Sequence, residues 1–259
     1  MPDLTWLAGL LEGEGTFMAG PPSSPRCPVV RVEMTDRDVV VRVAALIDRT
    51  VSSPNPRKGN KRSYITAIKG RPAIALMLQV APMLSEARRR QIRRALRPTG
   101  PRRLSHAERP HTIRWLAGLL EGEGSFVAKR GGTWLTIAIE MCDRPTISAA
   151  ATMLGASSVT RRRDPRHDRW TPTYRAAVVG NRAIPWMREL RPMMGQRRRR
   201  AIDRALASWT PIRLWPAPAN CTVSGCSRPH RGRGLCHAHY MRWSRYRAAG
   251  KDPGFQPLR

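Results

Sequence analysis

Acidic residues, cysteines and long apolar segments are all scarce in this 259-residue chain. Only 18 residues are Asp or Glu, against 47 Lys and Arg, so the formal net charge at pH 7 is +29. Such an excess of positive charge indicates a polyanionic partner, with nucleic acid as the main candidate. The five cysteines do not fit a secreted disulfide framework, because three of them crowd into the C-terminal tail.

The sequence contains no long apolar run, no amphipathic basic anchor and no signal peptide. These absences argue against a membrane surface as the polyanion. We therefore expect a protein that is not secreted, and that is cytoplasmic or nucleoid-associated in a bacterial or phage-like setting. Nearly all of the positive charge is arginine, and part of that can reflect a GC-rich genome, so arginine content alone does not define how phosphates are bound.

One nine-residue segment, LAGLLEGEG, occurs twice, at residues 7–15 and again at residues 116–124. Trp precedes both copies, and Thr-Phe or Ser-Phe follows them, so the chain is a tandem duplication. Each copy reads as an apolar helix with two glycines spaced by four on another face. Such glycines let two helix backbones approach closely. We expect the two copies to pack against each other, which would compensate for the poor helix propensity of glycine.

That packing would bring Glu14 and Glu123 together at the C-termini of the two helices. The helix dipole disfavours carboxylates there, and two neighbouring anions repel each other. A cation between them removes both costs, and oxygen ligands suit magnesium or calcium. The alternative is that the acids merely cap a solvated helix end, but this does not explain why they are duplicated.

The two copies resemble the LAGLIDADG motif of homing endonucleases, in the form that carries both motifs on one chain. The resemblance covers roughly residues 4–208. It implies an α+β fold of two pseudo-symmetric αββαββα units packed through the paired motif helices. It also implies catalytic Mg²⁺ or Mn²⁺ at Glu14 and Glu123, together with Gly13 and Gly122; many members have aspartate in place of the glutamates. The metal would activate water and stabilise the leaving 3′ oxygen on each strand.

Further residues recur in register through the two halves, among them Asp36 with Asp143, Tyr64 with Tyr174, and Pro82 with Pro192. The duplication therefore extends over the fold and not only over the motif. We divide the chain into a first unit, a Pro/Arg/His-rich linker, a second unit, a second linker and a zinc-binding basic module, at residues 1–97, 98–112, 113–208, 209–219 and 220–259.

Periodicity and turn residues predict the elements of each unit. In the first unit we expect helices at 4–13, from Asp36 or Asp38 to 47, at 71–80 and at 86–96. Strands are expected at 16–19 and 29–34 and on both sides of a basic turn at 57–62, the later one at 63–68. In the second unit we expect strands at 134–141 and 173–179, helices at 145–154, 182–190 and 196–207, and an arginine-rich turn at 161–170.

Two more pairs of residues are catalytic candidates. Asp36 and Asp143 follow the second strand of each unit, where family members often place a polar residue that orients water. They could equally be helix N-caps. The resemblance also puts Arg88 and Arg198 near the scissile phosphates, although adjacent arginines in the same helices could take that place or simply contact DNA phosphates.

The sheets are expected to supply the DNA-binding surface, because strands can lie in the major groove, where base edges carry a distinct code. Arginine to guanine is the commonest base contact, but phosphate contact is the better expectation for any single residue. The candidates are Arg31, Arg57, Lys58, Lys61, Arg62 and Lys69 in the first unit, Arg161, Arg162, Arg163, Arg166, Arg169 and Arg175 in the second, and Arg242 and Arg245 in the tail.

The tail carries a pattern of three thiolates and an imidazole, the usual closed ligand set for structural zinc: Cys221, Cys226, Cys236 and His239. His230 or His237 could replace His239, and reduced free cysteines are the alternative to a metal site. Some 40 residues with so little apolar content could hardly fold without metal. Trp243 and Tyr246 lie among arginines, which suggests an extra DNA contact.

Together these features predict a monomeric, site-specific endonuclease that cuts double-stranded DNA and serves intron or intein mobility. The resemblance implies cleavage across the minor groove with short 3′ overhangs. Two alternatives are an RNA-splicing maturase that binds intron RNA, and a DNA-binding regulator that kept the fold without cleavage. The acids in both copies argue against the regulator but not against a maturase.

Overall fold

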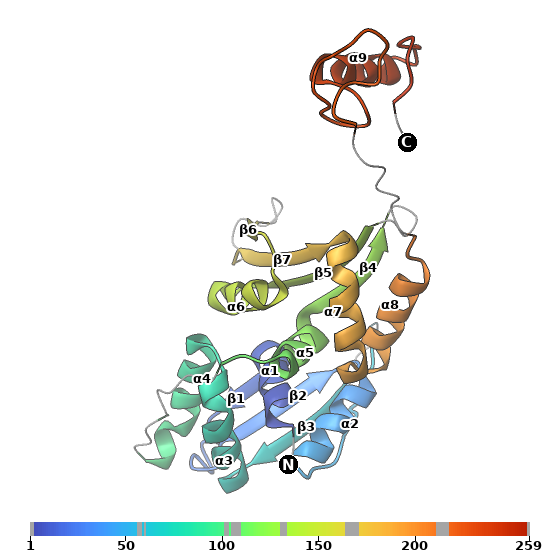
Figure 1. Ribbon diagram of the computed structural model, residues 1–259. Coiled ribbons are helices and arrows are strands. Elements are labelled where there is room, and N and C mark those ends of the chain that lie inside the picture. Colours follow the sequence, from blue (N-terminus) through green and yellow to red (C-terminus); the bar gives the residue numbers. More distant parts are fainter. Residues whose placement is uncertain are drawn as a thin grey trace. The chain divides into compact units, whose positions relative to one another are not determined.

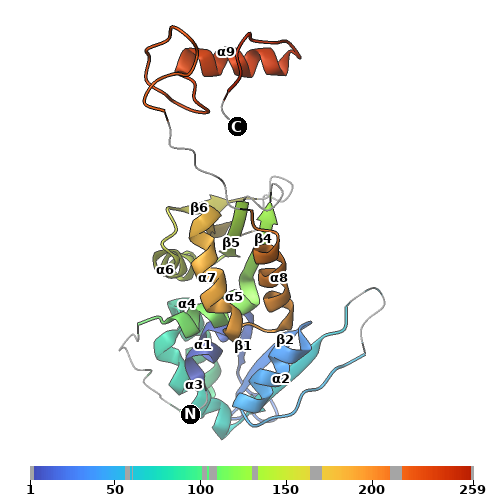
Figure 2. The same ribbon diagram turned by 45° about the vertical axis from the view of Figure 1, so that its right-hand side comes forward.

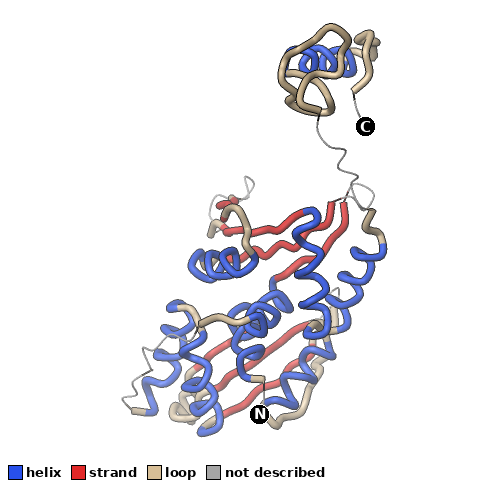
Figure 3. Tube along the Cα trace, in the orientation of Figure 1, coloured by secondary structure: helices blue, strands red, loops and turns tan. Residues whose placement is uncertain are grey.

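The computed structural model describes residues 3–55, 59, 61–100, 104, 110–129, 134–163, 171–210 and 218–257. The chain forms two compact units, Met1–Thr210 (the large unit) and Pro211–Arg259 (the small unit). Figure 3 shows two sheets with helices packed around them in the large unit, and a helix with loops in the small one. Among the described residues, no helix is long and apolar enough to cross a membrane.

The first half of the large unit follows the expected order of helices and strands. Its elements are α1 (Leu4–Glu14), β1 (Gly15–Met18), β2 (Val29–Met34), α2 (Arg37–Leu46), β3 (Tyr64–Lys69), α3 (Arg71–Val80), the 3-10 helix η1 (Ala81–Met83), α4 (Glu86–Leu96) and η2 (Arg97–Thr99). The sheet is antiparallel in the order β1-β2-β3. The strand expected before the basic turn is reduced to a single bridge between Ser52 and Ile65, so this sheet has three strands.

The second half repeats the plan with one more strand. Its elements are α5 (Ile113–Glu123), β4 (Gly124–Lys129), β5 (Trp134–Met141), α6 (Arg144–Leu154), β6 (Val159–Arg162), β7 (Thr173–Val179), η3 (Gly180–Arg182), α7 (Ala183–Leu190), η4 (Arg191–Met193) and α8 (Gln196–Ala207). The sheet order is β4-β5-β7-β6. The turn expected to begin at Arg161 begins later, because β6 pairs with β7 through Arg162 opposite Thr173.

Most strands bury alternate residues, although the central strand β5 buries five in a row and the edge strand β6 buries none. In β2, Val30, Val32 and Met34 are buried, whereas Arg31 and Glu33 point the other way and are more exposed. This period of two is typical of an antiparallel sheet that packs helices on one face and leaves the other open. The open faces are therefore available for a partner.

The two motif helices pack against each other between the two sheets (Figures 1 and 2). A Cβ atom on Gly9 would lie 1.9 Å from the carbonyl oxygen of Trp115, and one on Gly118 would lie 1.9 Å from that of Trp6. Because the obstacle is backbone in both cases, only glycine fits at the crossing. The expected pairing of the helices is thereby confirmed.

Within residues 218–257, the small unit contains one helix, α9 (His237–Ala248), and two isolated bridges, Asn220 with Pro229 and Gly232 with Leu235. Its buried apolar side chains, among the residues described there, are Cys221, Leu235 and Cys236. So small a core cannot offset the chain entropy of folding by itself.

The crossing glycines give the first testable prediction. Gly9→Ala should lower the free energy of unfolding of the large unit by about 1–3 kcal/mol, because the new methyl group forces the helix backbones apart. Urea unfolding followed by circular dichroism measures this. Gly232→Ala is the matched control, since a Cβ there would meet only Tyr240, at 3.7 Å. An unchanged midpoint for Gly9→Ala would contradict the close crossing.

Candidate active site and metal-binding cluster

Glu14 and Glu123 are the last residues of α1 and α5, and each side chain lies against the other motif helix. A Cβ on Gly13 would come within 2.9 Å of Cγ of Glu123, and a Cβ on Gly122 within 2.9 Å of Cγ of Glu14. The second glycine of each motif therefore makes room for the partner's acid. The two carboxylates meet at the interface in a nearly twofold arrangement.

The environment of these acids disfavours their charged forms. Burial raises the pKa of Glu14 above its usual value, against the opposing pull of Arg198, Arg197 and Arg88. Burial also raises the pKa of Glu123, and repulsion from Glu14 adds to the effect. Two partly buried carboxylates that repel each other are a suitable donor set for a hard divalent cation, which would favour their ionised forms. The residues present therefore fit the magnesium that the motif implies.

A hollow connects one of these acids to the open face of the first sheet. Its lining residues come from the end of α1, from β1 and β2, and from α4: Gly13, Glu14, Gly15, Thr16, Met18, Arg31, Glu33 and Arg88. A polymer lying along the open face could thus reach the carboxylate of Glu14.

Arg88 and Arg198 bind the C-terminal carbonyl groups of the motif helices. Arg88 donates from Nε to the carbonyl oxygen of Glu12 (2.8 Å), and from its terminal nitrogens to those of Gly13 (2.7 Å) and Gly15 (2.9 Å). These carbonyls have no partner inside the helix, and the positive guanidinium also opposes the negative end of the helix dipole. Arg88 is therefore a helix cap as well as a cation beside the acids.

Arg198 repeats this arrangement at the end of α5. It donates to the carbonyl oxygens of Glu121 (3.1 Å) and Gly122 (2.7 Å). The Gly13 and Gly122 carbonyls, expected near the metal, thus each accept a hydrogen bond from an arginine, and each oxygen keeps a second lone pair.

The other acid of each motif holds the N-terminus of the last helix in its half. Glu12 is buried and accepts hydrogen bonds from the amide (2.8 Å) and hydroxyl (2.6 Å) of Ser85, and it lies 3.3 Å from the hydroxyl of Thr146. Glu121 is also buried and accepts from the Gly195 amide (2.5 Å). Burial raises the pKa of both carboxyl groups. These contacts give Glu12 and Glu121 a structural role.

The two halves differ where α4 and α8 begin. Ser85 caps α4 by accepting a hydrogen bond from the Arg88 amide. The matching residue before α8 is Gly195, which has no side chain, and Asp38 of the first half instead accepts from the Gln196 amide (2.6 Å). The first half thus supplies a cap that the second half lacks.

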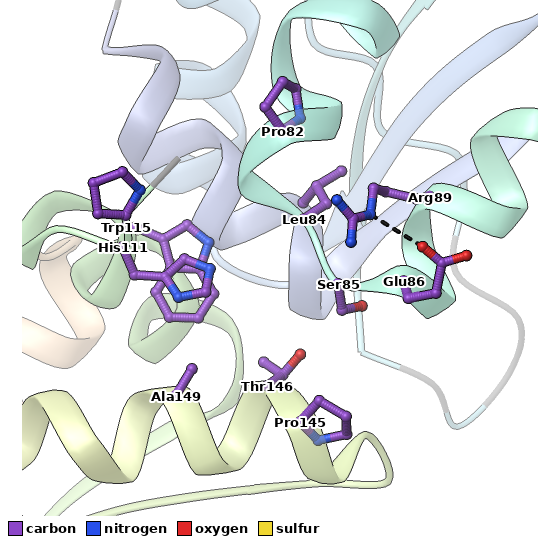
Figure 4. Close-up of a pocket in the computed structure, with 11 residues that line it drawn as sticks. Pro82, Leu84, Ser85, Glu86, Arg89, His111, Trp115, Pro145, Thr146 and Ala149 are labelled. Atoms are coloured by element: carbon purple, nitrogen blue, oxygen red, sulfur yellow. Dashed lines mark ion pairs between the residues drawn. The ribbon is translucent and has the colours of Figure 1, made fainter. Parts of the chain in front are cut away.

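Arg42 of α2 makes another contact from the first half to the second. Its guanidinium lies 3.6 Å over the Trp6 ring and donates to the carbonyl oxygen of Met193 (2.7 Å). The matching residue of α6 is Ala149, which lines a hollow beside Trp115 together with Ser85, Glu86, Arg89 and Thr146 (Figure 4). His111 stacks on Trp115 there, at 3.8 Å between ring centroids.

Asp36 and Asp143 are used differently, although they occupy matching positions. Asp143 accepts hydrogen bonds from the amide (3.0 Å) and hydroxyl (2.7 Å) of Thr146, which makes it the N-cap of α6. Asp36 makes no such cap and instead accepts from Nε of Arg197, at 2.7 Å. The N-cap alternative therefore holds for Asp143 and not for Asp36.

The expected DNA contacts lie in several places. Arg31 pairs with Glu33 on the open face of β2, and Lys69 ends β3. Arg175 and Arg162 lie near Glu140, with Arg162 3.0 Å from its carboxylate. Lys61, Arg62, Arg161 and Arg163 are exposed, whereas Arg57, Lys58, Arg166 and Arg169 fall outside the described residues.

The sheets also carry exposed apolar side chains, which the charge pattern of the sequence does not indicate. Met18, Val127, Trp134 and Val179 are each 37–39% exposed. Alternation along the strands could have identified them, since each occupies a position that does not point into the core. They would supply apolar contacts next to the charged residues.

The cysteines and histidine of the small unit come together as predicted. The ligand atoms of Cys221, Cys226, Cys236 and His239 all lie within 4.8 Å of one another. Sγ of Cys226 is 3.9 Å from Sγ of Cys236, and Nδ1 of His239 is 3.3 Å from Sγ of Cys221. Tetrahedral zinc with Zn–S bonds of about 2.3 Å requires sulfur atoms about 3.8 Å apart. The cluster therefore fits a four-coordinate ion, with His239 as the fourth ligand.

Basic side chains lie beside the aromatic side chains of α9. Arg233 and Arg247 lie 5.1 Å and 5.3 Å from the Trp243 ring, and Arg242 lies 5.4 Å from that of Tyr246. Trp243 also lines a hollow with Arg233, Arg247 and Lys251. This surface suits a phosphate-bearing ligand.

No family model matches this sequence, and no curated protein matches it. Among solved structures, it is similar to the LAGLIDADG homing endonuclease I-LtrWI bound to target DNA, with 15% identity, a TM-score of 0.52, and coverage of 79% of this chain and 89% of that one. The LAGLIDADG meganuclease I-AabMI bound to uncleaved DNA is 13% identical, with a TM-score of 0.54. I-GzeII, in complex with its DNA target, is 12% identical, with a TM-score of 0.51. Both have the same coverage of the two chains. The fold is thus that of the LAGLIDADG homing endonucleases, as expected.

The capping arginine gives the second prediction. Arg88→Met should lower the free energy of unfolding by on the order of 2–3 kcal/mol, because three carbonyl groups lose a charged donor. Arg90→Met removes the same charge from an exposed position of α4 and serves as the control. Chemical denaturation of the two variants compares them, and equal stability would show that the helix cap contributes nothing.

Proposed function

We propose that the protein is a monomeric, site-specific endonuclease that cuts both strands of DNA with the help of a divalent metal. The observation that carries this proposal is the crossing of Glu14 and Glu123, each seated against the other helix's glycine. Both acids come from one chain, so a single copy can act on two strands. The net charge of +29 supports a nucleic-acid substrate.

The residues around the acids have separable roles in this proposal. Glu14 and Glu123, with the Gly13 and Gly122 carbonyls, would hold Mg²⁺ or Mn²⁺. When bound, the metal supplies Lewis acidity that activates water and stabilises the leaving oxygen. Arg88 and Arg198 orient the carbonyl groups and add positive charge near the scissile phosphates.

The open faces of the two sheets would bind the DNA target. Arg31 and Lys69 lie on or beside one face, and Arg162 and Arg175 belong to the other sheet. Phosphate contacts would set the register, and base contacts in the major groove would set the sequence. An enzyme built in this way suits intron or intein mobility, which requires one long target site.

The small unit would bind structural Zn²⁺ and lengthen the DNA contact. Its four ligands leave no open position for water, and thiolates are poor partners for magnesium. Arg242 and Arg245 on α9 would contact phosphates. This unit therefore contributes affinity and not chemistry.

The paired acids provide the direct test of the endonuclease. Glu14→Gln and Glu123→Gln should each retain binding to duplex DNA and lose double-strand cutting in magnesium, measured on a pool of randomised duplexes. Some nicking can survive, because the two sites share one interface. Glu189→Gln, the same substitution at an exposed position of α7, should cut normally. Full cutting by either motif variant would contradict the assignment, and tighter binding to structured RNA than to any duplex would favour a maturase.

The small unit provides the fourth prediction. Deleting residues 217–259 should weaken DNA binding and shorten the protected DNA, yet leave cutting at high enzyme concentration. Elemental analysis of the intact chain should find about one zinc, which the Cys226→Ser, Cys236→Ser double variant loses. The proposed roles of the small and large units are contradicted if the intact chain holds no zinc, or if the truncated chain binds DNA tightly but does not cut it.

A further inference from the structure

Matching positions in the two halves allow the two candidate cleavage sites to be compared residue by residue. Arg88 and Arg198 match, because each binds the end of a motif helix. Asp36 and Asp143 match, because each immediately precedes the helix that follows the second strand. In the same register, Arg197 matches Ala87, since each comes one residue before the capping arginine. One site thus has an arginine where the other has a methyl group.

The two aspartates, Asp36 and Asp143, have different hydrogen-bond partners. The Asp36 side chain is only 10% exposed and accepts a hydrogen bond from Nε of Arg197, at 2.7 Å. Arg197 itself is half-exposed, so its remaining N–H groups can reach a ligand. Asp143 has its Oδ2 atom bound to the amide and hydroxyl of Thr146 within its own helix.

Glu14 and Glu123 also have different side chains beside them. The side chain of Glu14 lies beside Gly122, whose carbonyl oxygen accepts a hydrogen bond from Arg198, and Arg197 immediately precedes Arg198. The side chain of Glu123 lies beside Gly13, whose carbonyl oxygen accepts a hydrogen bond from Arg88, and Ala87 immediately precedes Arg88. Glu14 is therefore grouped with Arg197 and its partner Asp36, whereas Glu123 is grouped with Ala87.

We infer that the two sites are unequal and that the site of Glu14, Asp36 and Arg197 cuts its strand first. This rests on the proposed endonuclease function. Negative charge grows on the phosphate oxygens as water adds to phosphorus, and a cation fixed in advance lowers that barrier. Arg197 is fixed by its hydrogen bond to the largely buried Asp36. Arg197 is a positioning and charge-stabilising residue that Ala87 cannot replace.

The chemistry is the same on both strands. One water molecule forms a bond to phosphorus, and the bond from phosphorus to O3′ breaks, leaving a 5′-phosphate and a 3′-hydroxyl. The water loses one proton to solvent, and the 3′ oxygen takes one up. Only the rates of the two cuts differ.

The test follows each strand separately in single-turnover reactions of the full chain with magnesium. A duplex recovered from the randomised pool carries a different dye on each strand. The wild type should nick one strand several-fold faster than the other. Arg197→Ala and Asp36→Asn should both slow that same strand, on the order of tenfold or more, and leave the other nearly unchanged. Arg197→Lys should restore part of the rate.

Two controls separate this effect from loss of charge or of folding. Arg204→Ala removes an exposed arginine from the same helix and should keep the ratio of the two rates. Ala87→Arg adds the missing cation and should quicken the slower strand. A third readout needs neither metal nor DNA: the losses of thermal stability from Asp36→Asn and Arg197→Ala should be non-additive, because each removes one partner of the same ion pair.

The inference is overturned if the wild type nicks both strands at one rate, or if Arg197→Ala slows both strands equally. Additive losses of stability would also overturn it, because the ion pair would then hold nothing in place. Absence of any nicking by the wild type is a different result, since it would remove the endonuclease function on which the inference rests.

Discussion

The close approach of two helix backbones at Gly9 and Gly118 is the constraint on which the rest of the large unit depends. A methyl group at either position would overlap a carbonyl oxygen of the other helix. Because the crossing is this tight, the helix ends also meet, and each second glycine leaves space for the partner's glutamate. The same crossing places one sheet on each side (Figure 1). An interface that stabilises the fold thus also assembles the candidate catalytic acids, and Arg88 and Arg198 partly offset the cost of burying their charge.

The halves are no longer independent copies. Asp38 of the first half caps α8, Arg42 binds the Met193 carbonyl, and Arg197 of the second half holds Asp36. The Asp38 contact compensates for the side chain that is lacking where Gly195 stands in the place of Ser85, and the two arginines have alanines as their counterparts. Contacts of this kind between the halves stabilise their association. They also make the two candidate cleavage sites chemically different.

The repeat made the helix pairing, the fold and the meeting of the two acids predictable, because identical segments imply identical environments. Regular periodicity likewise gave the exact bounds of α3, α4, β5, β7 and α8. Contacts between the halves were not predictable, since Gln196 and Asp38 are 158 residues apart and nothing local marks them as partners. The sequence also did not show that the segment before the basic turn, which contains Ser, Pro and Asn, forms a single bridge at Ser52 in place of a fourth strand. The role of Arg88 as a helix cap could not be separated from that of its arginine neighbours until the end of α1 was seen beside it.

The positions of the two cuts on a duplex test the central claim most directly, because their separation reports how close together the two acids act. The measurement is to incubate the protein with a randomised duplex library and magnesium, and to sequence both ends of every product. If Glu14 and Glu123 act across one interface, the two cuts should lie a few base pairs apart across the minor groove, at one family of sites, with 3′ overhangs. Nicks in a single strand, or paired cuts separated by a helical turn of roughly 10 base pairs or more, would contradict the account.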